Sequence, residues 1–218
     1  MRGLFITLEG PEGSGKSTAL NAIADFFQSN NIPYLRTREP GGSTIGHPIR
    51  SILLDPHQIL APEAELFLFL ADRAQHIAHT VRPAIENGVT VICDRYFDST
   101  IAYQGYGRGL PIEYLRDLNY MATRQFIPDL TLLLDLPVEV GLRRAATRNA
   151  QMVNSDESRF DNEVVEFHEK VRAGFLEMAR LEEHRFCIIN AMMNKDEVGH
   201  SCVASCREEL IERGLVKI

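Results

Sequence analysis

Residues 4–18 read LFITLEGPEGSGKST, and this stretch decides the expected fold. The run LFITLE predicts a buried strand, and residues 10–17 then follow the pattern G-x-x-x-x-G-K-[ST]. Glycines let the backbone curl around a phosphate with its N–H groups pointing inward, while a helix expected over 16–29 presents its positive N-terminal end there. Because a strand precedes the pattern and a helix follows it, we predict a phosphate-binding loop rather than an incidental glycine-rich turn.

The loop residues have expected roles. Lys16 is predicted to bridge the β and γ phosphates of a nucleotide as a catalytic cation, and the Ser17 hydroxyl is predicted to ligate Mg²⁺. The predicted nucleotide-binding residues are Gly10, Pro11, Glu12, Gly13, Ser14, Gly15, Lys16, Ser17 and Thr18.

Short apolar runs alternate with segments of helical spacing along the whole chain. The runs are 4–10, 33–40, 89–94, 129–136 and 185–190, and the helical segments are 16–29, 62–87, 111–124, 137–148, 160–183 and 195–213. The three central runs are almost continuously apolar, which suits strands covered on both faces. The alternation predicts an α/β fold of the P-loop NTPase kind, with a parallel sheet, helices on both of its faces and one domain over residues 1–218.

One polar stretch interrupts this alternation. Residues 149–158 (NAQMVNSDES) separate two helical segments and contain few apolar anchors. We therefore expect a flexible lid over about residues 144–160.

Composition narrows the class of ligand. The chain has 218 residues and a formal net charge of −7, which argues against broad electrostatic binding to nucleic acid. Its 23 basic residues comprise 19 Arg and 4 Lys, and guanidinium groups grip phosphate oxygens two at a time. Ordinary compositional bias explains this excess equally well, so composition alone supports phosphate chemistry only weakly.

The cysteines bear on location. Cys93, Cys187, Cys202 and Cys206 occur without a secretory segment at the N-terminus, which predicts free thiols in a cytoplasmic protein. His200, Cys202 and Cys206 match no familiar zinc spacing, so we expect the two cysteines to be small buried residues of a C-terminal helix. No apolar run approaches the roughly 20 residues of a membrane span.

Charged residues gather where strands are expected to end. Asp94 and Arg95 follow the run VTVIC, at the carboxyl end of a strand, where open α/β sheets bind their ligands. Asp94 is predicted to hold a magnesium-bound water, and the alternative is an Asp–Arg pair that caps the next helix. Arg38 ends another run and is a candidate ligand for a second substrate's phosphate, joined by Arg50, unless it is a solvated strand end.

Two further groups suit nucleotide chemistry. Phe69 and Arg73 stand four apart on a helix, so a nucleobase could stack on the ring while the cation bonds its carbonyl edge; plain core packing is the alternative. Arg144 and Arg148 precede the polar stretch of residues 149–158, and Arg159 follows it. Arginines there can swing onto a transferring phosphoryl group, unless they simply complement the helix dipole.

The motifs GPEGSGKST, TREPGGS, ELFLFLADRAQH, CDRYFDSTIAYQG and RFDNEVVEFHEKVRAGF resemble, in order and spacing, those of bacterial thymidylate kinases. The resemblance covers about residues 4–183, and it implies a five-stranded parallel sheet, a homodimer, Mg²⁺, ATP as phosphoryl donor and dTMP as acceptor. The chain departs from the family pattern at Asp161, where Glu is expected, and at Asn190, where the last strand usually ends in Asp.

The resemblance also implies roles for individual residues. Glu12 is expected near the acceptor's 3′-hydroxyl, Phe69 against thymine, Arg73 at its O4, Gln104 on the base and Tyr103 against the 2′ position. The loop lacks a basic residue at its variable positions, which is typical of the branch with catalytic arginines in the lid. The predicted catalytic residues are Lys16, Arg95, Arg144, Arg148 and Arg159; the predicted acceptor-binding residues are Glu12, Arg38, Arg50, Phe69, Arg73, Arg95, Tyr103 and Gln104.

Other activities remain open at this point. A monophosphate acceptor is a dianion near neutral pH and needs no general base, whereas the hydroxyl acceptor of a nucleoside kinase needs one, with Glu12 as the candidate. A kinase for another monophosphate is the near alternative. A GTPase-type switch is the remote one, because residues 194–197 (NKDE) match only part of the guanine-reading pattern N-K-x-D.

Overall fold

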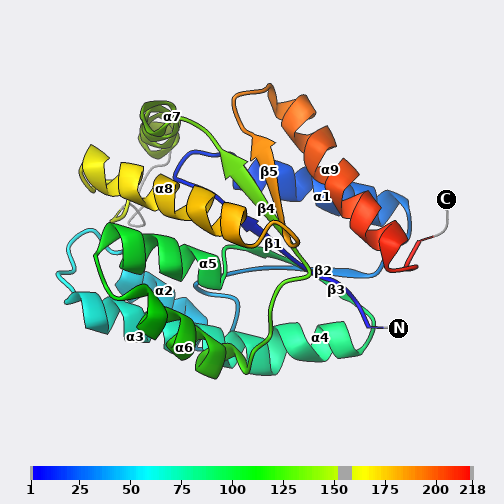
Figure 1. Cartoon of the computed structure of the whole chain (residues 1–218), viewed down its shortest axis with the longest axis horizontal. Helices are drawn as coiled ribbons and strands as arrows, with labels where there is room; N and C mark the ends of the chain where they lie inside the picture. The colour runs from blue at the N-terminus through cyan, green and yellow to red at the C-terminus, as the bar shows by residue number, and fades with distance from the viewer. Residues whose placement is uncertain (1, 152–158, 217–218) are drawn as a thin grey trace.

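A computed structural model describes residues 2–151 and 159–216, and it contains one five-stranded sheet (Figure 1). The strands are β1 (Phe5–Glu9), β2 (Tyr34–Arg38), β3 (Thr90–Asp94), β4 (Leu130–Asp135) and β5 (Phe186–Asn190). They are all parallel, in the order β2-β3-β1-β4-β5, so the strand before the loop lies at the centre of the sheet. The predicted parallel α/β sheet is confirmed.

Helices connect the strands. They are α1 (Lys16–Ser29), α2 (Gly46–Leu54), α3 (Pro62–His76), η1 (Ile77–Val81), α4 (Arg82–Glu86), α5 (Phe97–Thr100), η2 (Ile101–Gly107), α6 (Ile112–Thr123), α7 (Val138–Gln151), α8 (Val165–Leu181) and α9 (Lys195–Glu212), of which η1 and η2 are π-helical.

Each face of the sheet carries its own core, because successive residues of a strand point to opposite faces. Ile6 and Leu8 of β1 pack in the cluster that α1 and α9 complete, whereas Phe5 packs in the cluster that α8, η1 and η2 complete. Helices accordingly cover both sides of the sheet (Figure 1). Cys202 and Cys206 of α9 are fully buried in the first cluster, which confirms that they are small core residues.

Several helix boundaries differ from the sequence prediction. The segment expected as one helix over 62–87 divides into α3, η1 and α4, because Pro83 has no N–H to donate and interrupts the regular ladder. A helical segment over 97–107 was missed, since Gly105 and Gly107 lower helix propensity there.

The helices beside the expected lid also differ from the prediction. Helix α7 continues to Gln151, and α8 begins at Val165 rather than at residue 160. Phe160 is buried, and its ring contacts hold residues 159–164 in turns instead of a helical extension. The central part of the expected lid, 152–158, lies outside the described residues.

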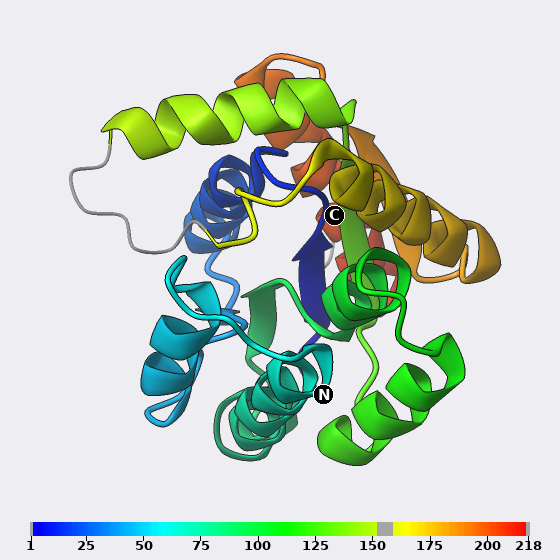
Figure 2. The ribbon, with the colours of Figure 1, turned by 90° about the vertical axis from the view of Figure 1, so that its left-hand side faces the viewer.

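Figure 2 shows how these elements surround one end of the sheet, with α7 on one side and α2 and α3 on the other. The loop between β1 and α1 lies between them. Among the helices described, none is long and apolar enough to cross a membrane.

Candidate active site

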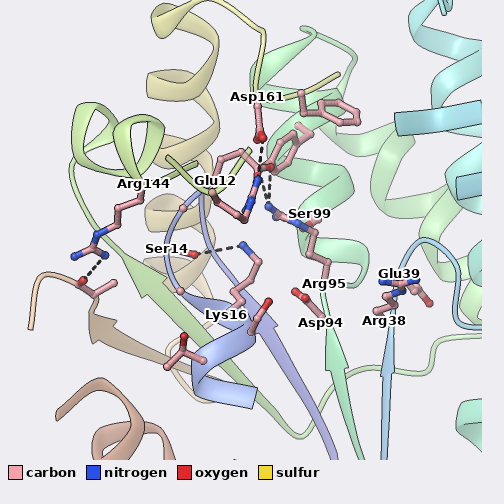
Figure 3. Close-up of a pocket in the computed structure, with 18 of the residues that line it drawn as sticks. Glu12, Ser14, Lys16, Arg38, Glu39, Asp94, Arg95, Ser99, Arg144 and Asp161 are labelled. Carbon is pink, nitrogen blue, oxygen red and sulfur yellow. Dashed lines mark hydrogen bonds and ion pairs between the residues drawn. The ribbon is translucent and has the colours of Figure 1, made fainter. Parts of the chain in front are cut away.

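A cleft of about 1120 Å³ opens at the carboxyl ends of the strands. Residues from the loop after β1, the ends of β2 and β3, α7 and the segment after residue 158 line it (Figure 3). It brings together nearly all residues that the sequence predicted for the site. The exceptions are Gly10, Pro11 and Arg159, which do not line it.

Three glycines shape the phosphate-binding loop. Gly10, Gly13 and Gly15 have φ angles of 143°, 69° and 92°, a region that residues with a side chain rarely adopt. Gly15 is also the N-cap of α1, so the loop leads directly into the N-terminal turn of that helix. Unpaired N–H groups of a first helical turn suit an anion such as phosphate.

Lys16 lies folded over this loop. Its Nζ donates hydrogen bonds to the carbonyl oxygens of Gly10 (3.1 Å) and Pro11 (3.2 Å) and to Oγ of Ser14 (3.3 Å). Burial and the nearby Arg95 lower the pKa of Lys16 to about 8, so it remains mostly protonated at neutral pH. The ammonium group therefore stands where it can contact a phosphate held by the loop.

The loop packs directly on the start of α7. A Cβ atom at Gly13 would lie 2.0 Å from the carbonyl oxygen of Gly141, and one at Gly141 would lie 2.4 Å from the carbonyl oxygen of Glu12. Glycine inside a helix lowers its stability by about 1 kcal/mol relative to alanine. The close contact between the two backbones explains why glycine nevertheless occupies position 141. The contact places α7, with its arginines, beside the phosphate loop.

Asp94 has the property expected of a metal-binding carboxylate. Its Oδ1 is buried and has no hydrogen-bond partner in the part of the chain that the structure describes. Ser17, in the first turn of α1, is exposed and lines the same cleft. A hydroxyl and an unsatisfied carboxylate oxygen, with room for water, are the hard oxygen donors that Mg²⁺ prefers.

Arg95 connects the phosphate-binding loop to Ser99 and Tyr103. Its guanidinium donates to the carbonyl oxygen of Gly10 (3.1 Å), Oγ of Ser99 (3.1 Å), Oε1 of Glu12 (2.9 Å) and the hydroxyl of Tyr103 (2.9 Å). The Tyr103 hydroxyl in turn donates to Oε1 of Glu12 at 2.8 Å. Arg95 stands in the left-handed region, with φ 66°, where β3 turns into the next segment.

Glu12 is an ionised carboxylate in this setting. Burial alone would raise the pKa of Glu12, but the charges of Arg95 and Lys16 and the hydrogen bond from Tyr103 bring it down to about 2. At neutral pH this group accepts hydrogen bonds and is far too weak a base to remove a proton from a hydroxyl.

Two further arginines border the side of the cleft formed by β2 and α2. Arg38 is exposed at the end of β2, and Arg50 of α2 donates to the carbonyl oxygen of Pro40 at 3.0 Å. Both line the cleft.

Aromatic rings form the next part of this wall. Phe69 lies 6.2 Å from Phe160, and Tyr103 meets Phe160 edge to face at 5.5 Å, measured between ring centroids. Phe160 lines the cleft although sequence reasoning missed it. Its position directly after Arg159, at the end of the expected lid, was the available signal.

Arg73 and Gln104 are buried behind these rings, each 1% exposed, yet both line the cleft. Four of the five N–H donors of Arg73 are engaged. They bond Oε2 of Glu39 (2.7 Å), Oγ1 of Thr100 (2.8 Å), Oδ1 of Asn119 (2.7 Å) and the carbonyl oxygen of Tyr96 (3.0 Å). Nε2 of Gln104 donates to Oε1 of Glu65 at 2.8 Å. No local sequence pattern marks these partners, so the sequence did not predict them.

The three arginines assigned to the lid point in two directions. Arg144 and Arg148 of α7 both line the cleft; Arg144 donates to the carbonyl oxygen of Ala191 (2.9 Å, Figure 3), and Arg148 pairs with Oδ2 of Asp161 (2.9 Å). Arg159 instead pairs with Glu65 and donates to the carbonyl oxygen of Leu53 at 2.9 Å. In this structure Arg159 does not line the cleft.

The NKDE stretch has a structural explanation. Oδ1 of Asn194 accepts hydrogen bonds from the backbone N–H groups of Asp196 and Glu197, and the Glu197 side chain accepts the N–H of Asn194. This is a capping box that begins α9. It removes the sequence argument for a guanine-reading motif.

Comparison with known proteins agrees with this geometry. A family model described as thymidylate kinase matches residues 8–201. A thymidylate kinase of Desulfovibrio desulfuricans is 52% identical over 214 residues, which cover 97% of this chain and 98% of that protein. A thymidylate kinase of Carboxydothermus hydrogenoformans is 48% identical over 198 residues, which cover 91% of this chain and 94% of that protein. This chain belongs to the thymidylate kinase family.

Proposed function

We propose that this cleft transfers the γ-phosphoryl group of ATP to dTMP, giving ADP and dTDP, with the two nucleotides bound at opposite ends. The observation that carries the proposal is the position of the phosphate-binding loop directly beside a pocket of Arg38, Arg95, Phe69 and Gln104. A loop that holds a triphosphate and a second pocket suited to a phosphorylated base are what a monophosphate kinase requires.

The donor end is the loop of residues 10–18. Its backbone N–H groups and Lys16 hold the β and γ phosphates, and the N-terminal end of α1 adds its positive dipole. Ser17 and Asp94 are the residues that would hold Mg²⁺. When bound, Mg²⁺ neutralises charge on the phosphates.

At the acceptor end, Arg38, Arg50 and Arg95 neutralise the phosphate of dTMP and direct it toward the loop. Its phosphate oxygen is already anionic, so positioning and charge neutralisation are sufficient for attack. Glu12, with its pKa near 2, accepts a hydrogen bond from the 3′-hydroxyl. The same low pKa disfavours a nucleoside kinase, since its hydroxyl acceptor would need a general base that titrates near neutral pH.

Catalytic charge comes from α7 as well as from the loop. Arg144 and Arg148 stabilise the negative charge that spreads over the transferring group, together with Lys16 and Arg95. Arg159 is assigned a different role, since its guanidinium is engaged by Glu65 and Leu53.

We also propose a homodimer and a cytoplasmic location. Exposed apolar side chains on α3 and α6, namely Phe67, Tyr114 and Met121, offer surface for a second copy. All four cysteines are free thiols, which suits a reducing compartment. Sedimentation analysis of the purified protein tests the dimer.

The direct test of the activity is an assay of ADP release with dTMP, dUMP, dCMP, dGMP and thymidine as acceptors, and with ATP or GTP as donor. We expect ATP with dTMP to give the highest kcat/KM. A preference for thymidine would indicate a nucleoside kinase, and hydrolysis of GTP without transfer would indicate a switch protein.

A further inference from the structure

Glu65 of α3 is fully buried, does not line the cleft, and receives hydrogen bonds from three side chains. Nε2 of Gln104 donates to its Oε1 at 2.8 Å, Arg108 donates to both of its oxygens at 3.3 Å, and Arg159 pairs with Oε2. A buried carboxylate is costly unless it is paired and hydrogen-bonded, and here both conditions are met. Guanidinium groups thus face both oxygens of Glu65, and both oxygens act as hydrogen-bond acceptors.

A carboxylate whose two oxygens both accept from guanidinium groups has no donor to offer to a further partner. The Gln104 amide must therefore turn its NH₂ group, and not its carbonyl oxygen, toward Glu65. This chemical requirement fixes the orientation of the amide.

The other end of the amide consequently faces the cleft. Gln104 lines the cleft, and within the described part of the chain no donor is bonded to its Oε1. This oxygen is not fully buried, so the small exposed surface of Gln104 includes it. The acceptor pocket thus presents a hydrogen-bond acceptor at this point.

The same cluster supports the rings of the pocket. The guanidinium of Arg159 lies 5.1 Å from the centroid of Phe160, and that of Arg108 lies 5.8 Å from it. Glu65 therefore connects three segments that are distant in sequence: α3, the end of η2 and the end of the expected lid at Arg159 and Phe160.

We infer that Glu65 is a positioning residue for the choice of base. By holding Nε2 of Gln104, it presents Oε1 as an acceptor and favours pyrimidines with an N3–H donor, as in thymine and uracil, over cytosine, whose N3 is itself an acceptor. This inference rests on the proposed function, because it assumes that the base of the acceptor lies against Gln104.

Glu65→Gln tests the inference. The amide introduced at position 65 can donate as well as accept hydrogen bonds, so it no longer holds the Gln104 amide in one orientation. Gln104 can then present either its carbonyl oxygen or its NH₂ group to the base, and the preference for a base with an N3–H donor is lost. We expect the ratio of kcat/KM for dTMP to kcat/KM for dCMP to fall about tenfold, mainly through the KM of dTMP. Glu63→Gln, on an exposed residue of the same helix, is the matched control and should leave the ratio unchanged.

A purely structural role predicts a different result. If Glu65 only stabilised the fold, Glu65→Gln would lower the melting temperature and both kcat/KM values together, and the unchanged ratio would overturn the inference. Should Glu65→Gln fail to fold, Glu65→Asp keeps the charge but withdraws the acceptor by one methylene group. It is expected to shift the ratio in the same direction, and an unchanged ratio would again contradict the inference.

A double mutant shows whether Glu65 affects the choice of base through Gln104. In a Gln104→Met background the amide is absent, so adding Glu65→Gln should no longer change the ratio. A further change there would show that Glu65 acts by another path. If the unmodified enzyme itself turned over dCMP as well as dTMP, the proposed acceptor would be wrong; that result is distinct from a selective enzyme whose Glu65 variants keep the ratio.

Discussion

The two ends of the cleft hold their arginines in different ways. At the acceptor end, Arg73 has a side chain 2% exposed and is bonded to Glu39, whose side chain is 1% exposed. At the donor end, Arg148 has a side chain 45% exposed, and its partner Asp161 is 10% exposed. One arginine is fixed in a buried network, and the other forms an ion pair at the surface.

This difference in exposure suits the two arginines to different tasks: recognition of the base and transfer of the phosphoryl group. Removing one partner of a buried ion pair costs about 3–5 kcal/mol, so Arg73 keeps one position and can define the shape of a base pocket. An exposed pair contributes about 0–1 kcal/mol, so Arg148 can exchange Asp161 for a phosphoryl group at little cost. We therefore expect the acceptor end to be rigid for recognition and the donor end to keep its cations exchangeable for the transfer step.

The largest effect is expected at the loop that both ends share. Lys16→Ala should lower kcat at least a hundredfold while the protein stays folded, because the proposed role of the Lys16 ammonium is to contact phosphate. Steady-state kinetics and thermal unfolding measure the two quantities. Lys170→Ala, at an exposed lysine of α8, is the control. Turnover within about tenfold of the unmodified enzyme, worth only ~1.4 kcal/mol of barrier, would contradict the assigned role.

Arg148→Ala tests the exchangeable end. We expect kcat to fall about ten- to a hundredfold with little change in the KM of dTMP, because the proposed role of the guanidinium is to stabilise the transition state. Arg144→Ala combined with it should deepen the loss. Arg180→Ala, which removes an exposed arginine of α8, should leave both parameters unchanged. A large rise in the KM of dTMP at normal kcat would move Arg148 to the acceptor end.

Tyr103 tests the rigid end. If its ring crowds the 2′ position of the sugar, Tyr103→Ala should narrow the gap in kcat/KM between dTMP and its ribose counterpart by about tenfold. Tyr103→Phe keeps the ring and loses the hydroxyl that bonds Glu12, so it should keep the gap. An unchanged ratio in Tyr103→Ala, even beside a large fall in activity on both substrates, would leave Tyr103 as a packing residue.

The smallest effect is expected from Arg159→Ala. Because Arg159 pairs with Glu65 and packs beside Phe160, its loss should raise the KM of dTMP several-fold and change kcat by no more than about threefold. The same kinetic assay, run beside Arg148→Ala, separates the two roles. A fall in kcat as large as that of Arg148→Ala would restore Arg159 to the transfer step.

Local patterns predicted the elements that depend on neighbours in sequence. The strand of LFITLE, the glycine loop and α1 follow one another within 26 residues, and their boundaries agree closely with the structure. The π-helical segments were not predictable in this way. Pro83 indicates that the helix over 62–87 is interrupted, but whether the interruption is π-helical depends on how the chain packs against β3 and α4.

The sequence by itself determined the parallel sheet and the phosphate loop, because hydrophobic alternation and the spacing of glycine, lysine and serine are local properties. The family followed from the resemblance of five longer motifs to those of thymidylate kinases. Only the tertiary structure decided which way each arginine points. Arg159 and its partner Glu65 are 94 residues apart, and Gln104 and Glu65 are 39 apart. A side chain with several donors takes the direction in which its buried partners satisfy it, and those partners become neighbours only when the chain is folded.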